Sequence, residues 1–260
     1  MGPTGAVAVV TGAARGIGRR VAEVLADEGY ALALTDLREP TEALEAVRQR
    51  GVEAFAVTGD VAADADVAAL AGRVVERFGR VDVLINNAGI SLLEPAEDTA
   101  PDRWRRVLEV NLTGPFLLCQ ALGRAMLRAG SGSIVNVASI AGLQGIADRA
   151  AYNASKHGLV GLTRTLAAEW GGRGVRVNAV CPSWVKTEMD VTDQASGAYT
   201  DSDIVEQVPM GRFASPDDIA AAVAFLAEPA RSGFVNGVAQ PVDGGWTADG
   251  GWTALRLRKR

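Results

Sequence analysis

The chain has 260 residues, of which 48% are hydrophobic, and its formal net charge is −5 at pH 7. This length can bury a sizeable core, and we expect one domain over residues 1–260. The acidic balance provides no general attraction for phosphate backbones or anionic membrane surfaces, so we expect neither a nucleic acid nor a membrane as a partner.

The cysteine and histidine content indicates the cellular compartment and whether a metal site is to be expected. The chain contains two cysteines, Cys119 and Cys181, and a single histidine, His157. Both cysteines lie in apolar stretches far apart in the sequence, which is typical of buried reduced thiols and indicates a cytoplasmic protein. No metal site is expected from so few imidazole and thiolate groups. No apolar run approaches the roughly 20 residues of a membrane span, and no signal segment is expected.

Short apolar runs alternate with longer amphipathic stretches along the whole chain. Apolar strands joined by helix-length crossovers indicate a parallel sheet covered on both faces. We therefore predict a Rossmann-type, doubly wound α/β fold with a seven-stranded, mainly parallel sheet. In such a fold, ligands bind beyond the carboxyl ends of the strands. The predicted strands cover residues 6–11, 31–35, 53–57, 81–85, 133–138, 175–181 and 237–242.

A glycine-rich segment, TGAARGIG (11–18), follows the first predicted strand. Gly12 permits a tight turn, and Gly16 and Gly18 would let the chain approach a ligand closely. A helix beginning near Gly16 would offer free N–H groups to a pyrophosphate. Taken alone, the segment is equally typical of a plain strand-to-helix connection.

Asp36 ends the second predicted strand, and its carboxylate bears on the choice of cofactor. A carboxylate there accepts hydrogen bonds from the adenosine ribose hydroxyls and repels the 2′-phosphate of NADP. At about 4 Å and intermediate dielectric that repulsion is on the order of a few kcal/mol, so NAD is the expected cofactor. Two alternatives stay open: Arg15 and Arg38 could bind a 2′-phosphate, or Asp36 could only cap a loop.

The segment AYNASKHGLVG (151–161) contains three candidates for proton transfer. Tyr152 and Lys156 lie one helical turn apart, so the ammonium would share a face with the phenol and lower its pKa from about 10. His157 projects about a hundred degrees away around the helix, and we expect it to be a surface or packing residue. Without further context, Tyr152 and Lys156 are also typical of helix packing and a solvated charge.

The C-terminal part combines a clear helix with two less regular segments. Ser215 and Pro216 predict the N-cap and first residue of a helix. Residues 188–212 are polar and irregular, as expected for a mobile flap. The unit DGGWTA occurs twice within 243–254, and the basic end LRLRKR follows, so 246–260 form an extension. Its alternating leucines and arginines predict either a solvated end or an extended segment lying against a neighbouring subunit, with a tryptophan near an active site and an arginine available for a carboxylated substrate.

Taken together, the motifs resemble those of the short-chain dehydrogenase/reductase family, in its single-domain branch of about 250 residues. The resemblance covers residues 4 to about 245. It rests on TGAARGIG, NNAG (86–89), Asn111, Ser139 after a predicted strand, YNASK (152–156) and CPSWVKTEM (181–189), which occur in the family's order. One departure is Ser183, where the family usually has glycine after Pro182.

The resemblance implies a role for each matching residue. Tyr152 would be the general acid/base, Ser139 would hold the substrate oxygen, and Asn111 would hold a water beside Lys156, which would also bind the nicotinamide ribose. Thr187 would bind the carboxamide, and Asp60 and Val61 would contact adenine. The predicted catalytic residues are Asn111, Ser139, Tyr152 and Lys156. The predicted cofactor-binding residues are Gly12, Arg15, Gly16, Ile17, Gly18, Asp36, Leu37, Asp60, Val61, Asn87, Ala88, Gly89, Tyr152, Lys156, Pro182, Val185 and Thr187.

The resulting expectation is an NAD-dependent dehydrogenase of alcohols or polyols that also reduces the ketone. The resemblance further implies a homotetramer or dimer built on helices around 103–129 and 150–171. An NADPH-dependent 3-oxoacyl thioester reductase is the enzymatic alternative, and a dinucleotide-sensing regulator is the alternative outside enzymes. A sugar-nucleotide epimerase or dehydratase would need a longer chain with a second substrate lobe.

Overall fold

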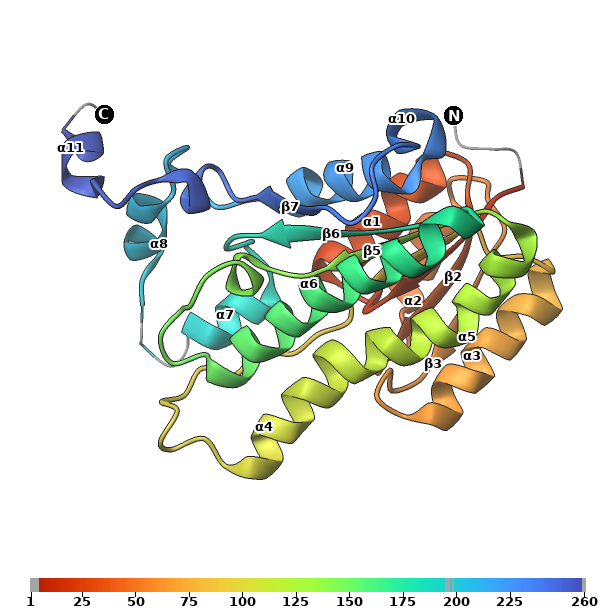
Figure 1. The fold of residues 1–260 in the computed structure, drawn as a ribbon, viewed down its shortest axis with the longest axis horizontal. Helices are drawn as coiled ribbons and strands as arrows, with labels where there is room; N and C mark the ends of the chain where they lie inside the picture. Colours follow the sequence, from red (N-terminus) through yellow and green to blue (C-terminus); the bar gives the residue numbers. More distant parts are fainter. Residues whose placement is uncertain (1–4, 195–196, 198, 259–260) are drawn as a thin grey trace.

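One sheet takes strands from nearly the whole length of the chain (Figure 1). The computed structural model describes residues 5–194, 197 and 199–258. Its strand order is β3-β2-β1-β4-β5-β6-β7, and every neighbouring pair is parallel, so the predicted sheet is confirmed and is parallel throughout. The strands are β1 Val7–Thr11, β2 Ala31–Asp36, β3 Ala54–Thr58, β4 Val83–Asn86, β5 Gly132–Val137, β6 Val175–Pro182 and β7 Ala239–Val242.

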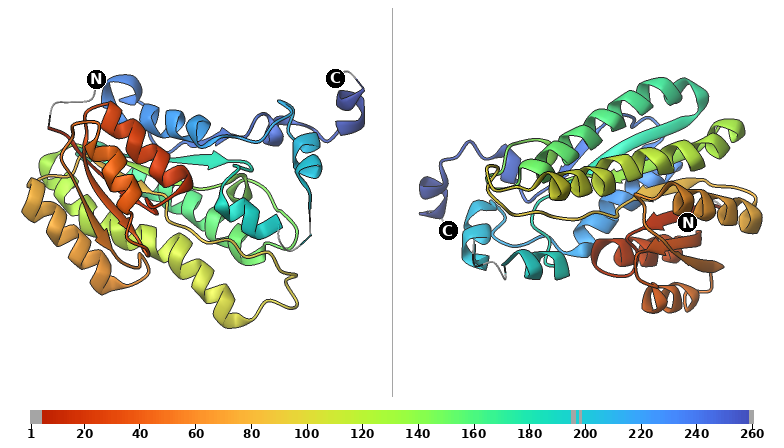
Figure 2. Two further views of the ribbon diagram at one scale, coloured as in Figure 1. Left: turned by 180° about the vertical axis from the view of Figure 1, so that it is seen from behind. Right: turned by 90° about the horizontal axis from the view of Figure 1, so that it is seen from below.

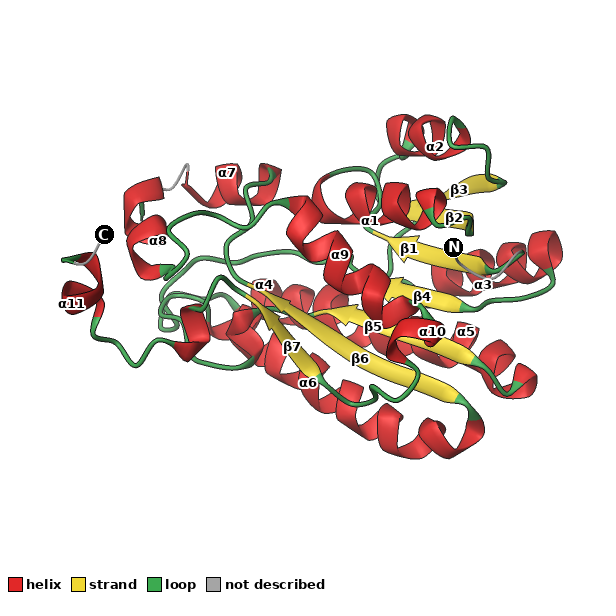
Figure 3. Cartoon of the chain, turned by 90° about the horizontal axis from the view of Figure 1, so that it is seen from above, coloured by secondary structure: helices red, strands yellow, loops and turns green. Residues whose placement is uncertain are grey.

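Helices cover both faces of the sheet (Figure 3). Helices α1, α2 and α9 lie on one face, and α3, α5 and α6 lie on the other. The α-helices are α1 Gly16–Asp27, α2 Thr41–Arg48, α3 Asp64–Phe78, α4 Pro101–Leu108, α5 Gly114–Ala129, α6 Ala150–Trp170, α7 Glu188–Gln194, α8 Asp201–Gln207, α9 Pro216–Ala227, α10 Pro229–Ser232 and α11 Thr253–Leu257. No helix in the described ranges is long and apolar enough to cross a bilayer.

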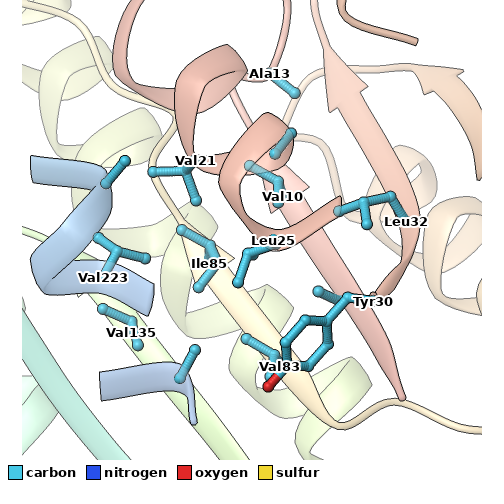
Figure 4. Close-up of a cluster of buried hydrophobic side chains, with 14 of the residues drawn as sticks. Val10, Ala13, Val21, Leu25, Tyr30, Leu32, Val83, Ile85, Val135 and Val223 are labelled. Atoms are coloured by element: carbon cyan, nitrogen blue, oxygen red, sulfur yellow. The ribbon is translucent and has the colours of Figure 1, made fainter. Parts of the chain in front are cut away.

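The alternation of side chains along β1 explains the two layers. Ala8 and Val10 belong to the apolar cluster beneath α1 and α9, whereas Val7 and Val9 belong to the cluster beneath α3 and α5. Figure 4 shows the first cluster, in which Val10 lies near Leu25 of α1, and Val223 of α9 lies beyond Val21 and Ile85. Each fully buried valine side chain stabilises the fold by about 1.5–3 kcal/mol. A strand without a polar face therefore requires helices on both sides.

Strands β1 and β4 lie side by side at the centre of the sheet. The strand that follows β1 in the chain, β2, lies on one side of this pair, and the strand that follows β4, β5, lies on the other side, so the strand order reverses here. Crossovers leaving these two strands diverge, and this opens a crevice at their carboxyl ends. The segments TGAARGIG and NNAG both begin there. The topology thus brings together two motifs that lie about seventy residues apart in the sequence.

The region expected to be irregular contains two helices, so that part of the prediction is wrong, whereas its movement as a flap stays a prediction. Helix α7 covers Glu188–Gln194 and α8 covers Asp201–Gln207, while residues 195, 196 and 198 lie outside the described part. A capping box begins α8, because Thr200 and Asp203 each bind the other's backbone N–H. Such a cap replaces missing intrahelical bonds and allows a short helix amid polar residues.

The end of the chain is also helical rather than extended. Residues Thr253–Leu257 form α11, which packs against α8 of the same chain at the far end of the molecule (Figures 1 and 2). The alternation of leucine and arginine is too short to decide between a strand and one helical turn. The last two residues of LRLRKR, 259 and 260, lie outside the described residues.

Candidate active site

The two loops at the switch point bind each other through buried polar groups. The Asn87 amide donates to the carbonyls of Thr11 (2.9 Å) and Gly12 (3.0 Å). The Thr11 hydroxyl accepts from the N–H groups of Asn87 and Ala88, each at 3.0 Å. A Cβ on Gly12 would lie 2.8 Å from the Ala88 Cα, so only glycine fits this turn. The side chain of Asn87 therefore shapes the pocket by holding the loop.

Gly18 has a packing role that the sequence did not indicate. A Cβ there would lie 2.1 Å from the Gly12 carbonyl oxygen, so its missing side chain lets α1 pack on the turn, and its contact with a ligand stays a prediction. Gly12, Arg15, Gly16 and Ile17 line the pocket. Arg15, the residue before α1, provides no capping side chain, so free N–H groups of the first helical turn remain for an anion. This end of the pocket fits a dinucleotide pyrophosphate.

Asp36 stands at the end of β2 beside this loop. Its carboxylate accepts hydrogen bonds from the N–H groups of Ala14 (3.0 Å) and Arg38 (3.2 Å). These bonds show that Asp36 does cap a loop, but a carboxylate has about four acceptor positions and retains capacity for ribose hydroxyls. Leu37 next to it is 59% exposed, which leaves an apolar surface for a base. Binding of the ribose by Asp36 stays a prediction.

Asp60 and Val61 are engaged with protein groups. The Asp60 carboxylate accepts from the Ala62 N–H (2.9 Å) and pairs with Arg106 (2.7 Å). Val61 is 8% exposed, and its carbonyl oxygen would lie 2.9 Å from a Cβ on Gly114. Neither residue lines the pocket. The predicted adenine contacts at these positions remain untested, and the structure assigns both residues to loop and helix packing.

Three of the predicted catalytic residues line one wall of the same pocket: Ser139, Tyr152 and Lys156. Ser139 follows β5, and its hydroxyl accepts from the Ala141 N–H (3.1 Å). Tyr152 and Lys156 lie on the first turns of α6, with the Lys156 Nζ 5.6 Å from the Tyr152 ring centroid. Nζ donates to the Val137 carbonyl at 2.9 Å, its one hydrogen bond within the described residues. An ammonium has three donors, so this group fits the hydroxyls of a nicotinamide ribose.

The pKa of Tyr152 departs from the sequence prediction. We expected Lys156 to lower it, whereas burial raises it in the protein alone, and hydrogen bonding with Ser139 and the charge of Arg149 only oppose this increase. Burial also lowers the pKa of Lys156 to about 8. In both cases desolvation of the charged form is the largest cause of the shift. Further positive charge beside Tyr152 is therefore needed before the phenol is acidic near neutral pH.

A consequence for stability is expected between pH 8 and 10.5. Lys156 has a pKa of about 8 in the fold against an ordinary value of 10.5, so the unfolded chain binds more protons in this window and stability rises with pH. The contribution is about 3 kcal/mol across the window. Urea unfolding of the cofactor-free protein and of Lys156→Met at several pH values measures it. The unfolding free energy of the wild type minus that of Lys156→Met should rise with pH. A constant value of this difference contradicts the burial of a chargeable lysine.

Asn111 lies beside the lysine in a five-residue π-helix, Glu109–Thr113, that interrupts the run from α4 to α5. Its carboxamide accepts from the Ile90 N–H (2.8 Å) and donates to the Ile90 carbonyl (2.9 Å) and the Ser155 hydroxyl (3.1 Å). A Cβ on Gly89 would lie 3.3 Å from the Asn111 Oδ1 and 3.6 Å from the Lys156 Nζ. The side chain thus fixes the NNAG loop, and its role beside a water stays a prediction.

The end of β6 and the segment after it form the opposite wall. Three residues predicted to bind the cofactor line the pocket there: Pro182, Val185 and Thr187. The Thr187 methyl lies 3.4 Å from where a Cβ on Gly16 would stand, so this segment closes over the glycine-rich loop. Trp184 packs on Trp246 with ring centroids 4.6 Å apart. The first DGGWTA copy therefore supports the pocket wall from behind.

Sequence reasoning missed Ser91, Arg149 and Asp193, which also line the pocket. Each lies in a different segment, and no spacing pattern joins them in the sequence. His157 is exposed, and its Nδ1 is 2.9 Å from the Asn153 carbonyl, in agreement with the prediction of a surface residue. Among the described residues no cluster of histidine, cysteine and carboxylate side chains could hold a metal ion.

The second DGGWTA copy repeats the first copy's turn but holds a different element. Asp243 and Asp249 each accept from the N–H of the glycine two residues later. Asp249 also pairs with Arg256 (3.0 Å), which donates to the carbonyls of Glu206 (2.6 Å) and other residues at the end of α8. The predicted availability of an arginine for a substrate is thus wrong for Arg256, because its guanidinium caps a helix.

Removing this cap should affect substrate binding through α8. Tyr199, just before α8, lines the pocket, so we expect Arg256→Ala to raise the KM for the substrate about fivefold and to leave kcat within about twofold, an effect of about 1 kcal/mol. Arg258→Ala, at the residue after α11, removes an equal charge without a known hydrogen bond to α8 and serves as the control. Equal KM values for both variants contradict a positioning role of Arg256.

These features define a dinucleotide-binding α/β protein with a pocket suited to hydride and proton transfer at one carbon. The protein-family model described as enoyl-(acyl carrier protein) reductase matches residues 12–247. D-threitol dehydrogenase of Mycolicibacterium smegmatis is 47% identical over 247 residues, which cover 94% of this chain and 93% of that protein. The 3-oxoacyl-[acyl-carrier-protein] reductase FabG of Staphylococcus epidermidis is 41% identical over 241 residues, 92% of this chain and 97% of that one.

A solved structure from Beutenbergia cavernae, described as an NAD(P)-dependent gluconate 5-dehydrogenase with NADP bound at low occupancy, agrees with this fold. It has a TM-score of 0.89 and 42% sequence identity, and it covers 95% of this chain and 99% of that chain. The chain belongs to the short-chain dehydrogenase/reductase family. It is accordingly an oxidoreductase acting on CH–OH groups.

Proposed function

We propose that the protein interconverts a secondary alcohol, such as a polyol, sugar or hydroxy acid, and the corresponding ketone, with NAD(H) as cofactor and Tyr152 as general acid/base. The observation that carries this proposal is that Ser139, Tyr152 and Lys156 meet in one pocket, which continues to the glycine-rich loop. NAD, held by the glycine-rich loop and Lys156, would supply the acceptor for the hydride of the carbinol carbon. The proton of the alcohol would pass to the Tyr152 oxygen, while Ser139 holds the substrate oxygen.

Supporting groups of the pocket would have distinct tasks. Lys156 would bind the nicotinamide ribose and keep positive charge close to Tyr152, 5.6 Å from its ring. Asn111 would hold the loop at Gly89 beside Lys156. It would also hold a water through which protons leave the site. Gly12, Arg15 and Gly16 would bind the pyrophosphate.

NAD is proposed over NADP because the Asp36 carboxylate lies beside the glycine-rich loop, where it would meet the adenosine ribose. A 2′-phosphate beside this carboxylate would be repelled. The exposed Arg15 and Arg38 favour NADP, and a solved relative contains NADP. The comparison of both cofactors is therefore part of the test.

A second candidate is reduction of a 3-oxoacyl thioester with NADPH. The description of the family model and the 41% identity to FabG favour it. Asp36 opposes it through its charge. A regulator that only senses dinucleotides would need neither Ser139 nor Tyr152, so the complete set of groups speaks for turnover.

We further propose a cytoplasmic homotetramer. Cys119 and Cys181 are buried and unpaired, as in a reducing compartment. Phe116 on α5 is 43% exposed, and α5 and α6 are the helices on which the assembly would be built. Contact of the C-terminal tail with a neighbouring subunit is compatible with Trp252, which is 75% exposed.

The test follows NADH and NADPH absorbance with polyols, sugars, hydroxy acids and a 3-oxoacyl thioester. We expect oxidation of at least one secondary alcohol with NAD at a higher kcat/KM than with NADP. Turnover confined to the thioester and NADPH would favour the second candidate, and absence of turnover with every substrate would favour the regulator.

A further inference from the structure

A closed cluster of three polar side chains lies in the pocket wall and takes no part in the reaction proposed above. Arg149 donates through Nη1 to the Ser91 hydroxyl (2.6 Å) and pairs through Nη2 with the Asp193 carboxylate (2.9 Å). The Ser91 hydroxyl donates to the same Asp193 oxygen at 2.9 Å. The cluster joins the loop after β4, the residue before α6 and the helix α7.

The cluster is close to the reacting groups and largely shielded from solvent. The side chains of Arg149 and Asp193 are 8% and 14% exposed. Arg149 precedes Tyr152 by three residues, and all three cluster members line the same pocket as Ser139 and Tyr152. A guanidinium at this depth requires a compensating charge, which Asp193 supplies.

The charges that line the pocket balance. The cations are Arg15, Arg149 and Lys156, and the anions are Glu188, Asp190 and Asp193, three of each sign. Asp190 accepts from the Tyr199 hydroxyl (3.1 Å) and pairs with Lys186 (3.2 Å). Arg149 therefore lies among carboxylates. The hydroxyl and carboxylate oxygens around it could accept hydrogen bonds from an alcohol.

We propose that Asp193, by neutralising Arg149, makes this wall select uncharged, polyhydroxylated substrates over carboxylates of the same size. The inference rests on the proposed function and specifies its substrate class. A substrate carboxylate would find no net positive charge in this wall to compensate its desolvation, because Asp193 already neutralises Arg149. A hydroxyl in the same place can donate to Asp193 and accept from an N–H group of Arg149 that the cluster does not use.

Threitol and threonate test the proposal because they differ only in a terminal CH₂OH or carboxylate. With NAD, the wild type should have a kcat/KM for threitol at least tenfold above that for threonate. In Asp193→Asn, which removes the neutralising charge and keeps the shape, the ratio of threonate to threitol should rise at least tenfold. Asp193→Glu keeps the charge and should retain the wild-type preference. Glu76→Gln on the exposed face of α3 is the control for overall charge.

The ratio is insensitive to a general loss of folded enzyme, because both substrates report on the same sample. An unchanged ratio in Asp193→Asn, or a wild type that prefers threonate, overturns the proposal while leaving an alcohol dehydrogenase in place. If neither compound nor any other alcohol is oxidised, the proposed function fails. Equilibrium binding of threitol and threonate to the NADH-loaded protein then decides the charge selection on its own, with the same direction expected in each variant.

Discussion

Replacing Tyr152 by phenylalanine is expected to lower kcat about a thousandfold while NAD binding stays within about twofold of the wild type. The substitution removes only the phenolic oxygen, and general acid–base catalysis contributes typically 10²–10⁴-fold. Because the ring remains beside Lys156, the pocket keeps its shape and its cofactor contacts. Steady-state rates with the best alcohol, together with a fluorescence titration of NADH, measure the two quantities.

The chain offers a matched control for this change. Tyr30 is 1% exposed in the core cluster beneath α1 (Figure 4), and its hydroxyl lies 3.5 Å from a Glu228 carboxylate oxygen, away from the pocket. Tyr30→Phe removes the same atom and should retain kcat. Substantial turnover by Tyr152→Phe, or equal losses in both variants, contradicts the assignment of Tyr152 as the acid/base.

The second large effect is expected at Asp36, which ends β2 beside the glycine-rich loop. Asp36→Asn should shift the ratio of kcat/KM for NADP to that for NAD about a hundredfold toward NADP, which corresponds to about 2.7 kcal/mol of removed repulsion. Asparagine keeps an oxygen for the Ala14 N–H, so the glycine-rich loop should remain in place. Parallel kinetics with the two cofactors measure the shift.

Arg38 provides the control for this interpretation. Its side chain is exposed next to Asp36, where it could bind the 2′-phosphate once the carboxylate is gone. In the double variant Asp36→Asn with Arg38→Ala, the gain for NADP should shrink while the loss of repulsion persists. An Asp36→Asn variant with the wild-type preference for NAD removes the charge argument.

Several features of the site followed from sequence because they are local. The strand-to-helix turn at Gly12 and the spacing of Tyr152 and Lys156 depend on a few neighbouring residues. The helix at Ser215 is a further example: its capping box with Asp218 and Pro216 at the first position match the sequence signature.

Other features could not be predicted because they depend on burial or on distant segments. The pKa of Tyr152 is raised since the fold surrounds it, and spacing to Lys156 alone says nothing of that cost. The cluster of Ser91, Arg149 and Asp193 joins three segments separated by more than forty residues each. Arg256 lies in α11 and caps α8. Its role could not be predicted, because the leucine and arginine pattern of the tail fits both a strand and a helix.

The sequence by itself determined the fold class, the order of the motifs and the identities of the candidate catalytic groups, because apolar periodicity and short-range spacing encode them directly. Tertiary structure alone decided which of these groups share a pocket, how burial changes their proton affinity and which charges neutralise one another. The physical reason is that desolvation and long-range contacts exist only once the chain has folded, so residues such as Arg149 acquire their chemical character from partners far away in the sequence.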